Sequence, residues 1–339
     1  MTGAVRQATL TGFLLAVGSA ATFSLSGIFA SALITAGWSA GAAATARICV
    51  AALVLAAPTA LALRGQWRQV LRAWRPILMF GLLAVVACQL AFFFAVQFIA
   101  PSLALLIEFM GPVLLMLWIW ARSRVSPPPL TLVGAAVAVL GLVTISGLTV
   151  GGALHPLGIV FALIAAVGNA AYYAAGAAAD HGIAPLPFVG LGLGVAAVCL
   201  AAVSATGLLP FTMTSVAPVI AGVEVSPLLV VAGMALISTV LAYVLGVSAS
   251  RRLGATVSSF TGYSEPLFGI VWTIVLLAIV PSGAQWLGAA LILTGVVTVK
   301  LGEMLATRRS IPAAISLPDR SAAGGHPPPA APRAHRCCS

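Results

Sequence analysis

The sequence predicts an all-α integral membrane protein in which ten transmembrane helices form two inverted five-helix repeats. Three observations predict this fold class: an apolar composition, ten apolar segments of membrane-spanning length, and an internal repeat. Of the 339 residues, 61% are hydrophobic and only 6% are charged, and the mean hydropathy is +1.15. Soluble domains contain about 25% charged residues. This composition therefore excludes a soluble enzyme, a nucleic-acid-binding protein and a disordered chain.

Ten apolar segments follow one another along the chain. A helix needs about 20 apolar residues to cross a bilayer, and each segment reaches that length. The first segment follows Arg6 and resembles a secretory signal, but it is longer than the apolar region of a signal, and many more spans follow it. The segments cover residues 8–33, 42–63, 76–97, 102–121, 128–147, 157–178, 187–208, 227–249, 254–279 and 283–303.

The positive charges of the loops predict the orientation of these segments. If the N-terminus is placed in the cytoplasm, the cytoplasmic segments carry 12 of the 16 Lys and Arg residues, and the loops on the opposite side carry none. Loops rich in Lys and Arg stay in the cytoplasm, so the split predicts a multi-pass protein with both termini inside. The 12 residues are Arg6, Arg64, Arg68, Arg72, Arg75, Arg122, Arg124, Arg251, Arg252, Lys300, Arg308 and Arg309.

A shift of 154 residues aligns the fourth and fifth segments with the ninth and tenth without a gap. Each repeat contains an odd number of spans, so the second enters the membrane upside down. We expect repeats over 8–147 and 157–304, followed by a disordered, Pro-rich, basic cytoplasmic tail over 306–339. Inverted repeats are typical of transporters that bind substrate near the midplane; a duplicated scaffold without transport is the alternative. The matched pairs include Pro112/Pro266, Trp118/Trp272, Gly134/Gly288 and Gly141/Gly295.

Three ionisable side chains lie inside apolar segments, where a charge costs at least about 2.5–3.5 kcal/mol. Glu108 and Glu265 lie near the middle of the fourth and ninth segments, and Arg47 lies about one turn inside the second. Pairing with Arg47, or protonation, lowers the cost of burying a glutamate. We expect the glutamates to bind a substrate ammonium group or to take up a proton, with Arg47 as a counter-charge. The alternatives are protonated carboxyls that only satisfy helix contacts and an arginine that snorkels to the interface.

Pro112 and Pro266 lie close to these glutamates in equivalent helices. Because proline has no N–H group, the carbonyls of Glu108 and Gly262 lose their helical donors. Freed backbone groups in a membrane are tolerated where they line a cavity or where a neighbour satisfies them. We predict helix-break hinges at Pro112, Pro266, Gly111 and Gly262. A kink that only improves packing is the alternative.

Further polar residues in mid-span are weaker candidates for the site. We expect Asn169, Tyr172 and Tyr243 to line the substrate cavity, although each residue is also a candidate for a helix–helix contact worth about 0.6 kcal/mol. Patterns of small residues such as Gly134 to Ala138 are too common to specify an interface. The sequence therefore ranks these residues below the three ionisable ones.

No motif indicates a cofactor, a metal or catalysis. The five cysteines show no CxxC or Cys/His ligand spacing, and no Walker A loop is present to bind ATP. Six acidic residues and four histidines leave little for acid–base chemistry. We expect a protein that is not an enzyme, has no cofactor and no metal, and has a small-molecule substrate and the lipid bilayer as partners. A homodimer is left open, and nothing indicates nucleic acid.

Several motifs resemble the EamA-like proteins of the drug/metabolite transporter superfamily, in the family's order and over about residues 8–304. The core of the second motif, Glu-Phe-Met-Gly-Pro, is similar to the threonine/homoserine exporter branch. One departure is that residues 120–124 and 277–281 lack the acidic residue that the family often has there. The motifs are ATARICVAALVL (44–55), LLIEFMGPVLLMLW (105–118), LAYVLGVSASRRLGATVSSFTGYSEPLFGIVW (241–272) and QWLGAALILTGVVTV (285–299).

The resemblance implies a secondary active transporter of the bacterial inner membrane. It would export a small metabolite such as an amino acid by alternating access between the repeats, and proton coupling is left open. One alternative is a membrane-embedded enzyme that acts on lipid-linked substrates; the outer loops offer only His155 and Glu224 for such chemistry. A non-transporting membrane scaffold is the other alternative.

Overall fold

The computed structural model describes residues 3–99, 101–145, 155–179, 182–277, 280 and 282–309, and these residues are almost entirely helical. The first half contains α1 (Gly3–Thr35), α2 (Ala40–Ala62), α3 (Trp67–Arg72), α4 (Trp74–Leu78), the π-helix η1 (Met79–Ala87), α5 (Cys88–Ala95), α6 (Pro101–Glu108), α7 (Gly111–Ser123) and α8 (Pro129–Ile145). The second half contains α9 (Pro156–Ala177), α10 (Pro185–Ala205), β1 (Val219–Ile220), β2 (Val223–Glu224), α11 (Pro227–Ala235), the π-helix η2 (Leu236–Leu241), α12 (Ala242–Leu253), α13 (Ala255–Thr261), the 3-10 helix η3 (Gly262–Ser264), α14 (Glu265–Leu277) and α15 (Gly283–Arg309).

Eight helical spans in the described residues are long and apolar enough to cross a membrane. These eight spans confirm a multi-pass membrane protein. The exact count of ten is not confirmed, because α8 is a shorter apolar helix of 17 residues and the expected ninth span is divided into α13, η3 and α14. α15 continues to Arg309, three residues beyond the predicted start of the tail, and residues 310–339 lie outside the described part of the chain.

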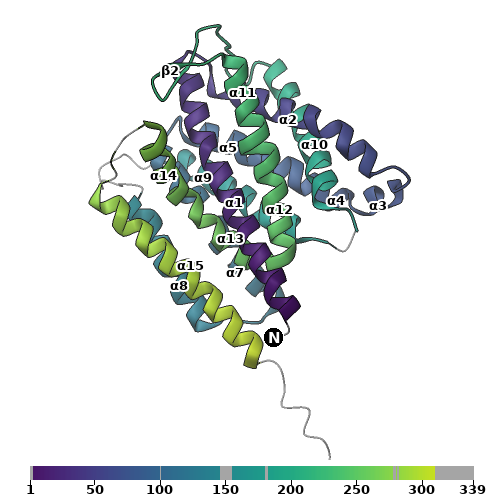
Figure 1. Ribbon diagram of the computed structural model, residues 1–339, viewed down its shortest axis with the longest axis vertical. Coiled ribbons are helices and arrows are strands. Elements are labelled where there is room, and N and C mark those ends of the chain that lie inside the picture. Colours follow the sequence, from purple (N-terminus) through teal and green to yellow (C-terminus); the bar gives the residue numbers. More distant parts are fainter. Residues whose placement is uncertain are drawn as a thin grey trace, which may run out of the picture.

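Glycines hold the last helices of the two halves together. α8 and α15 lie side by side at the lower left of Figure 1. A Cβ atom at Gly141 would lie 2.8 Å from the Gly288 carbonyl oxygen, and one at Gly295 would lie 2.5 Å from the Ala138 nitrogen. Further along, a Cβ atom at Gly302 would lie 2.5 Å from the Thr131 hydroxyl. Residue numbers rise on one helix as they fall on the other, so the two helices run antiparallel with their backbones in contact.

Two π-helical segments occupy equivalent places in the two halves. η1 interrupts the third span and ends at Ala87, and η2 interrupts the eighth span and ends at Leu241. The shift of 154 residues carries Ala87 onto Leu241. A π-helical turn inserts an extra residue and thereby changes the face that the following helix presents, and such turns are frequent at functional sites. The residues directly after each π-helix, Cys88 and Ala242, therefore mark where each half presents a new helical face.

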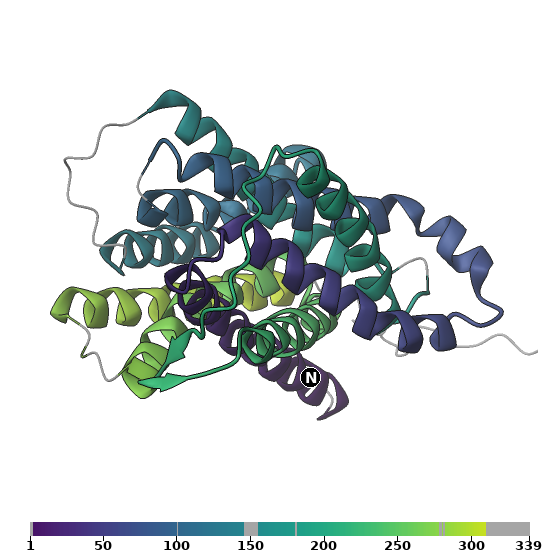
Figure 2. The same cartoon turned by 90° about the horizontal axis from the view of Figure 1, so that it is seen from above.

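Hydrogen bonds join the connection between α10 and α11 to the turn between α1 and α2. The Trp38 indole nitrogen donates to the Thr214 carbonyl at 2.9 Å, the Thr214 hydroxyl donates to the Ala36 carbonyl at 2.5 Å, and the Ser39 amide donates to the Thr212 carbonyl at 2.9 Å. Seen from above, this connection crosses the molecule from α10 to the small antiparallel hairpin of β1 and β2 (Figure 2). The two halves are thus tied together at this end of the bundle.

Candidate functional site

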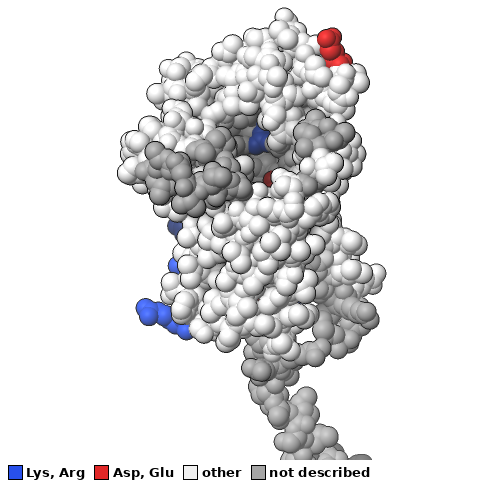
Figure 3. Space-filling view, turned by 90° about the vertical axis from the view of Figure 1, so that its left-hand side faces the viewer, with Lys and Arg blue, Asp and Glu red and all other residues white. Residues whose placement is uncertain are grey.

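A cavity of about 840 Å³ lies between the halves, lined by α1, α2, α5, α6, α8, α11 and α14. Most of its wall is apolar, and its charged lining residues are Arg47, Glu108 and Glu265. Figure 3 shows a hollow on one face of the molecule with a basic side chain deep inside and an acidic one near its floor. The structure therefore brings together, in one cavity, the three ionisable residues singled out in the sequence.

Arg47 projects from α2 and has spare hydrogen-bonding capacity. Its Nη1 atom donates to the Ser26 hydroxyl at 2.5 Å, whereas its Nε atom is buried without a partner. Arg47 also interacts electrostatically with both glutamates, and the glutamates interact with each other. A guanidinium has five donors in a planar fork that suits a carboxylate. The cavity thus contains a guanidinium group that has a donor without a hydrogen-bond partner, together with two carboxyl groups.

Both glutamates stand at breaks in their helices. Glu108 is the last residue of α6, and Phe109–Met110 separates it from α7. Glu265 is the first residue of α14, directly after the 3-10 turn η3. The breaks therefore place each carboxyl at a helix end facing the cavity. Pro112 and Pro266 lie in the first turn after each break, which is the position that proline tolerates best.

The two glycines predicted as hinges pack closely against α9. A Cβ atom at Gly111 would lie 2.6 Å from Asn169 Oδ1 and 2.9 Å from the Ala166 carbonyl oxygen. A Cβ atom at Gly262 would collide with the Tyr173 hydroxyl. Each glycine thus lets a broken helix approach α9, which is a packing requirement that the sequence pattern did not indicate. Asn169 is held against Gly111 and does not line the central cavity.

Tyr172 and Tyr243 also lie outside the cavity lining and instead form part of an aromatic plug below it. Phe23 lines the cavity, and its ring centroid lies 4.8 Å from that of Tyr243 and 6.1 Å from that of Tyr172. Phe80 packs behind both tyrosines, with centroid distances of 5.9 and 5.6 Å. The tyrosines therefore lie behind a residue of the cavity wall, and their expected contact with a substrate stays a prediction.

The plug continues to the side of the bundle that carries Arg251 and Arg252. Phe80 packs against Phe188 with a centroid distance of 5.2 Å, and the Arg251 guanidinium lies over the Phe188 ring at 5.4 Å. Arg251 also donates to the Ile183 carbonyl. A series of edge-to-face ring contacts thus runs from Phe23 in the cavity wall to Arg251 near the end of α12. The cavity opens on the face of the molecule seen in Figure 3, and these aromatic residues pack on the side towards Arg251.

Sequence reasoning missed several polar residues at the site. Ser24, Ser26 and Ser31 line the cavity, and a further polar side chain, beside Glu108, belongs to Cys88. Its thiol donates to Glu108 Oε1 at 3.4 Å. Cys88 is the first residue after η1, and Gly168 lets α9 pack against it, since a Cβ atom at Gly168 would lie 2.7 Å from Cys88 Cβ. The sequence shows only an isolated cysteine in an apolar segment, because neither the π-helix nor the contact with Glu108 has a signature in the residue pattern.

Replacing Cys88 with Ala is expected to lower the transport rate about two- to tenfold and to change its pH profile, since a hydrogen bond contributes a net 0.5–1.5 kcal/mol. Cys88→Ser keeps a donor and should retain both the rate and the profile. The measurement is initial flux against pH in proteoliposomes, with Cys199→Ala on α10 as a matched control. Equal profiles for the Ala and Ser variants would show that Cys88 only fills space.

Among the described residues, no group of three or more His, Cys, Asp or Glu side chains is arranged to hold a metal ion. The ionisable groups of the cavity lining are Arg47, Glu108 and Glu265, with the Cys88 thiol beside Glu108. Uncharged polar groups come from Ser24, Ser26, Ser31 and Gln89.

A helical bundle built from two halves around a charged cavity that is open on one side has the architecture of a membrane transport protein. Sequence comparison identifies the family. Residues 10–147 and 156–301 match the EamA-like transporter family, so the chain belongs to this family, whose members are membrane transporters of the drug/metabolite transporter superfamily. The match extends to the family and does not reach the threonine/homoserine exporter branch.

A solved structure titled "Crystal structure of protein" is similar in fold. It superposes with a TM-score of 0.67 at 20% sequence identity, and the match covers 87% of this chain and 98% of the other. At this identity the likeness concerns the fold alone. Comparison with curated proteins finds no match.

Proposed function

We propose that the chain is a secondary active transporter that exports a small zwitterionic metabolite, such as an amino acid, by alternating access between its halves. The observation that supports this proposal is the pairing of opposite charges in one cavity. Arg47 offers spare donors to a carboxylate, and Glu108 and Glu265 offer acceptors to an ammonium group. A molecule carrying both groups would satisfy both sides of the cavity at once.

The loop charges predict which side of the membrane the cavity faces, and the direction of export rests on the family resemblance. If the N-terminus is cytoplasmic, Arg251 and the aromatic plug face the cytoplasm, and the open mouth of the cavity faces outward. The conformation is then the outward-open one, from which substrate leaves. Opening of the plug would expose the same three residues to the cytoplasm, and proton uptake by a glutamate would couple that step to the proton gradient across the inner membrane.

Flux in proteoliposomes tests the proposal. Vesicles are preloaded with a panel of amino acids, matched amines without a carboxylate and matched acids without an amine, and efflux is followed with and without a pH gradient. We expect the zwitterions to move and the gradient to change their steady-state accumulation. Movement that only equalises concentrations would show facilitated diffusion. Faster movement of the amines or acids would contradict the zwitterion assignment.

A correctly folded protein that moves no member of a broad panel would favour the scaffold alternative. Turnover of a lipid-linked compound by the purified protein in detergent would favour the enzyme. A thermal-shift screen in detergent separates a missed substrate from a scaffold, because a ligand that binds the folded state raises the midpoint of unfolding.

A further inference from the structure

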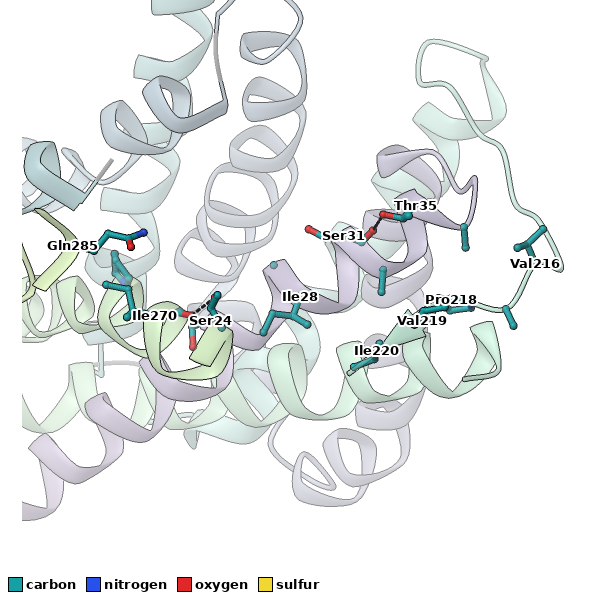
Figure 4. Close-up of a pocket in the computed structure, with 17 residues that line it drawn as sticks. Ser24, Ile28, Ser31, Thr35, Val216, Pro218, Val219, Ile220, Ile270 and Gln285 are labelled. Atoms are coloured by element: carbon teal, nitrogen blue, oxygen red, sulfur yellow. Dashed lines mark hydrogen bonds between the residues drawn. The ribbon is translucent and has the colours of Figure 1, made fainter. Parts of the chain in front are cut away.

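A second cavity, of about 800 Å³, runs along the other side of α1. Its lining comes from α1, α14, the start of α15 and the connection before α11. Figure 4 shows Ser24, Ile28, Ser31 and Thr35 in succession along α1, with Ile270 and Gln285 towards one end and Val216, Pro218, Val219 and Ile220 towards the other. From Ser24 to Ala36 the lined stretch of α1 extends about 18 Å at 1.5 Å per residue. The cavity is therefore long and narrow rather than spherical.

The lining of this lateral cavity is uncharged and mostly apolar. Most of its polar side chains already have hydrogen-bond partners within their own helices. Three hydroxyl groups donate to carbonyl groups three or four residues earlier, at 2.8–2.9 Å: Ser24 to Ala21, Thr35 to Ser31 and Thr273 to Gly269. Gln285 Oε1 accepts from the Ser282 amide at 2.8 Å. Few directional polar groups thus remain for a ligand, so the cavity suits a hydrocarbon.

A window of small residues joins the lateral cavity to the central one. Five residues line both: Ser24, Gly27, Ser31, Pro266 and Gly269. A Cβ atom added at Gly27 or at Gly269 would meet nothing within 4 Å. The two glycines therefore face open space, in contrast to the packed glycines of α8 and α15. The window lies between α1 of the first half and α14 of the second.

We propose that the lateral cavity binds a single hydrocarbon chain of a membrane amphiphile, with its polar head at the end lined by residues 216–220 and its hydrocarbon chain running towards the window. The lined part of α1 reaches the end of the candidate span Thr9–Thr35, and residues 216–220 lie outside the candidate spans, so the cavity runs from the membrane surface into the region of the acyl chains. α1 and α14 meet one turn before Ser24, where the Trp272 indole nitrogen donates to the Ala21 carbonyl at 2.8 Å, and the hydrocarbon chain would lie beside this contact. The source is either a bilayer phospholipid or a single-chain amphiphile that enters from the central cavity. The proposal stands without the transport proposal, since it concerns binding alone.

Photolabelling tests this binding on the full-length protein in phosphatidylcholine vesicles. One sample contains a phosphatidylcholine with a diazirine on one acyl chain, and the other contains a diazirine-bearing palmitic acid. After irradiation, adducts are mapped by mass spectrometry. We expect adducts concentrated in residues 24–36 and 266–273. Labelling by the phospholipid identifies a bilayer lipid, and labelling by the fatty acid alone identifies a single-chain amphiphile.

Two substitutions narrow the cavity without touching its charged neighbours. Gly269→Leu fills the window and Ile28→Trp fills the lateral cavity, and both are expected to reduce labelling of α1 and α14 roughly tenfold. Gly194→Leu on α10 is the matched control, because a Cβ atom there also meets nothing within 4 Å. Thermal unfolding verifies that each variant folds. Labelling of α1 and α14 no stronger than that of α10, or unchanged in both filled variants, would overturn the proposal.

Discussion

Replacing both Glu108 and Glu265 with Gln is expected to abolish the effect of a pH gradient on transport and to slow flux by an order of magnitude or more. A hydrogen bond to a charged group contributes about 1.5–3 kcal/mol, which corresponds to a factor of about ten or more in binding. Glutamine keeps the shape and the acceptor oxygen but cannot take up a proton or carry a charge. The double variant therefore removes the charge and leaves the packing of α6 and α14 in place.

The single variants separate the two roles. Loss of the gradient effect in only one of them identifies the proton-coupling glutamate, and weaker substrate binding in the other identifies the substrate contact. Initial rates and steady-state accumulation across a pH series are the measurements. Glu224→Gln, an exposed glutamate on the hairpin, is the matched control. Normal transport by both single variants and the double variant at every pH would show that neither carboxyl acts.

Gly295→Ala is expected to destabilise the protein by about 1–3 kcal/mol, although alanine is the better helix former by about 1 kcal/mol. The added methyl would lie 2.5 Å from the Ala138 nitrogen and 2.7 Å from Ala138 Cα. Neighbouring backbone cannot rotate aside as a flexible side chain can, so α8 and α15 must separate. Gly141→Ala, which meets the Ile292 nitrogen at 2.7 Å on the same interface, should have a similar effect.

Thermal unfolding in detergent measures this effect. Gly194→Ala is the control, because it lies inside α10 with open space at its Cβ position, and it should leave the midpoint unchanged or raise it. A Gly295→Ala variant as stable as Gly194→Ala would show that the backbones of α8 and α15 are not in contact. Because both interface variants act on one pair of helices, their combined effect should differ from the sum of the single effects.

Much of the architecture could be predicted from the sequence, since hydropathy marks a membrane span directly and a charge inside a span is conspicuous. Arg47, Glu108 and Glu265 could therefore be identified from the free-energy cost of burying a charge in the membrane, and the structure places them in one cavity. Helix breaks beside Pro112 and Pro266 follow from the missing N–H group. By contrast, the division of the ninth span at η3 was not expected from hydropathy, because hydropathy averages over local breaks in the helix.

The remaining features depend on pairing between distant segments. Nothing in the local pattern distinguishes Gly295, which touches the Ala138 backbone, from Gly269, which faces a cavity. Tyr172 and Tyr243 were expected to line the cavity since they are polar and in mid-span, yet both pack against Phe23, which lines it. The π-helices and the Cys88–Glu108 contact are set by how helices fit together. Such contacts become visible only in the folded structure, whereas a charged residue inside an apolar segment is visible in the sequence.

The antiparallel contact of α8 with α15 has a consequence for how the two ends of the bundle differ. In two separate, identical subunits related by a twofold axis, each residue would appear twice, once at each face of the membrane. A single continuous polypeptide releases that constraint. Cys88 therefore has Ala242 as its counterpart, Gln89 has Tyr243, and Glu108 has Gly262. The two halves can therefore share a common helical scaffold and still carry different side chains at the two ends of the bundle.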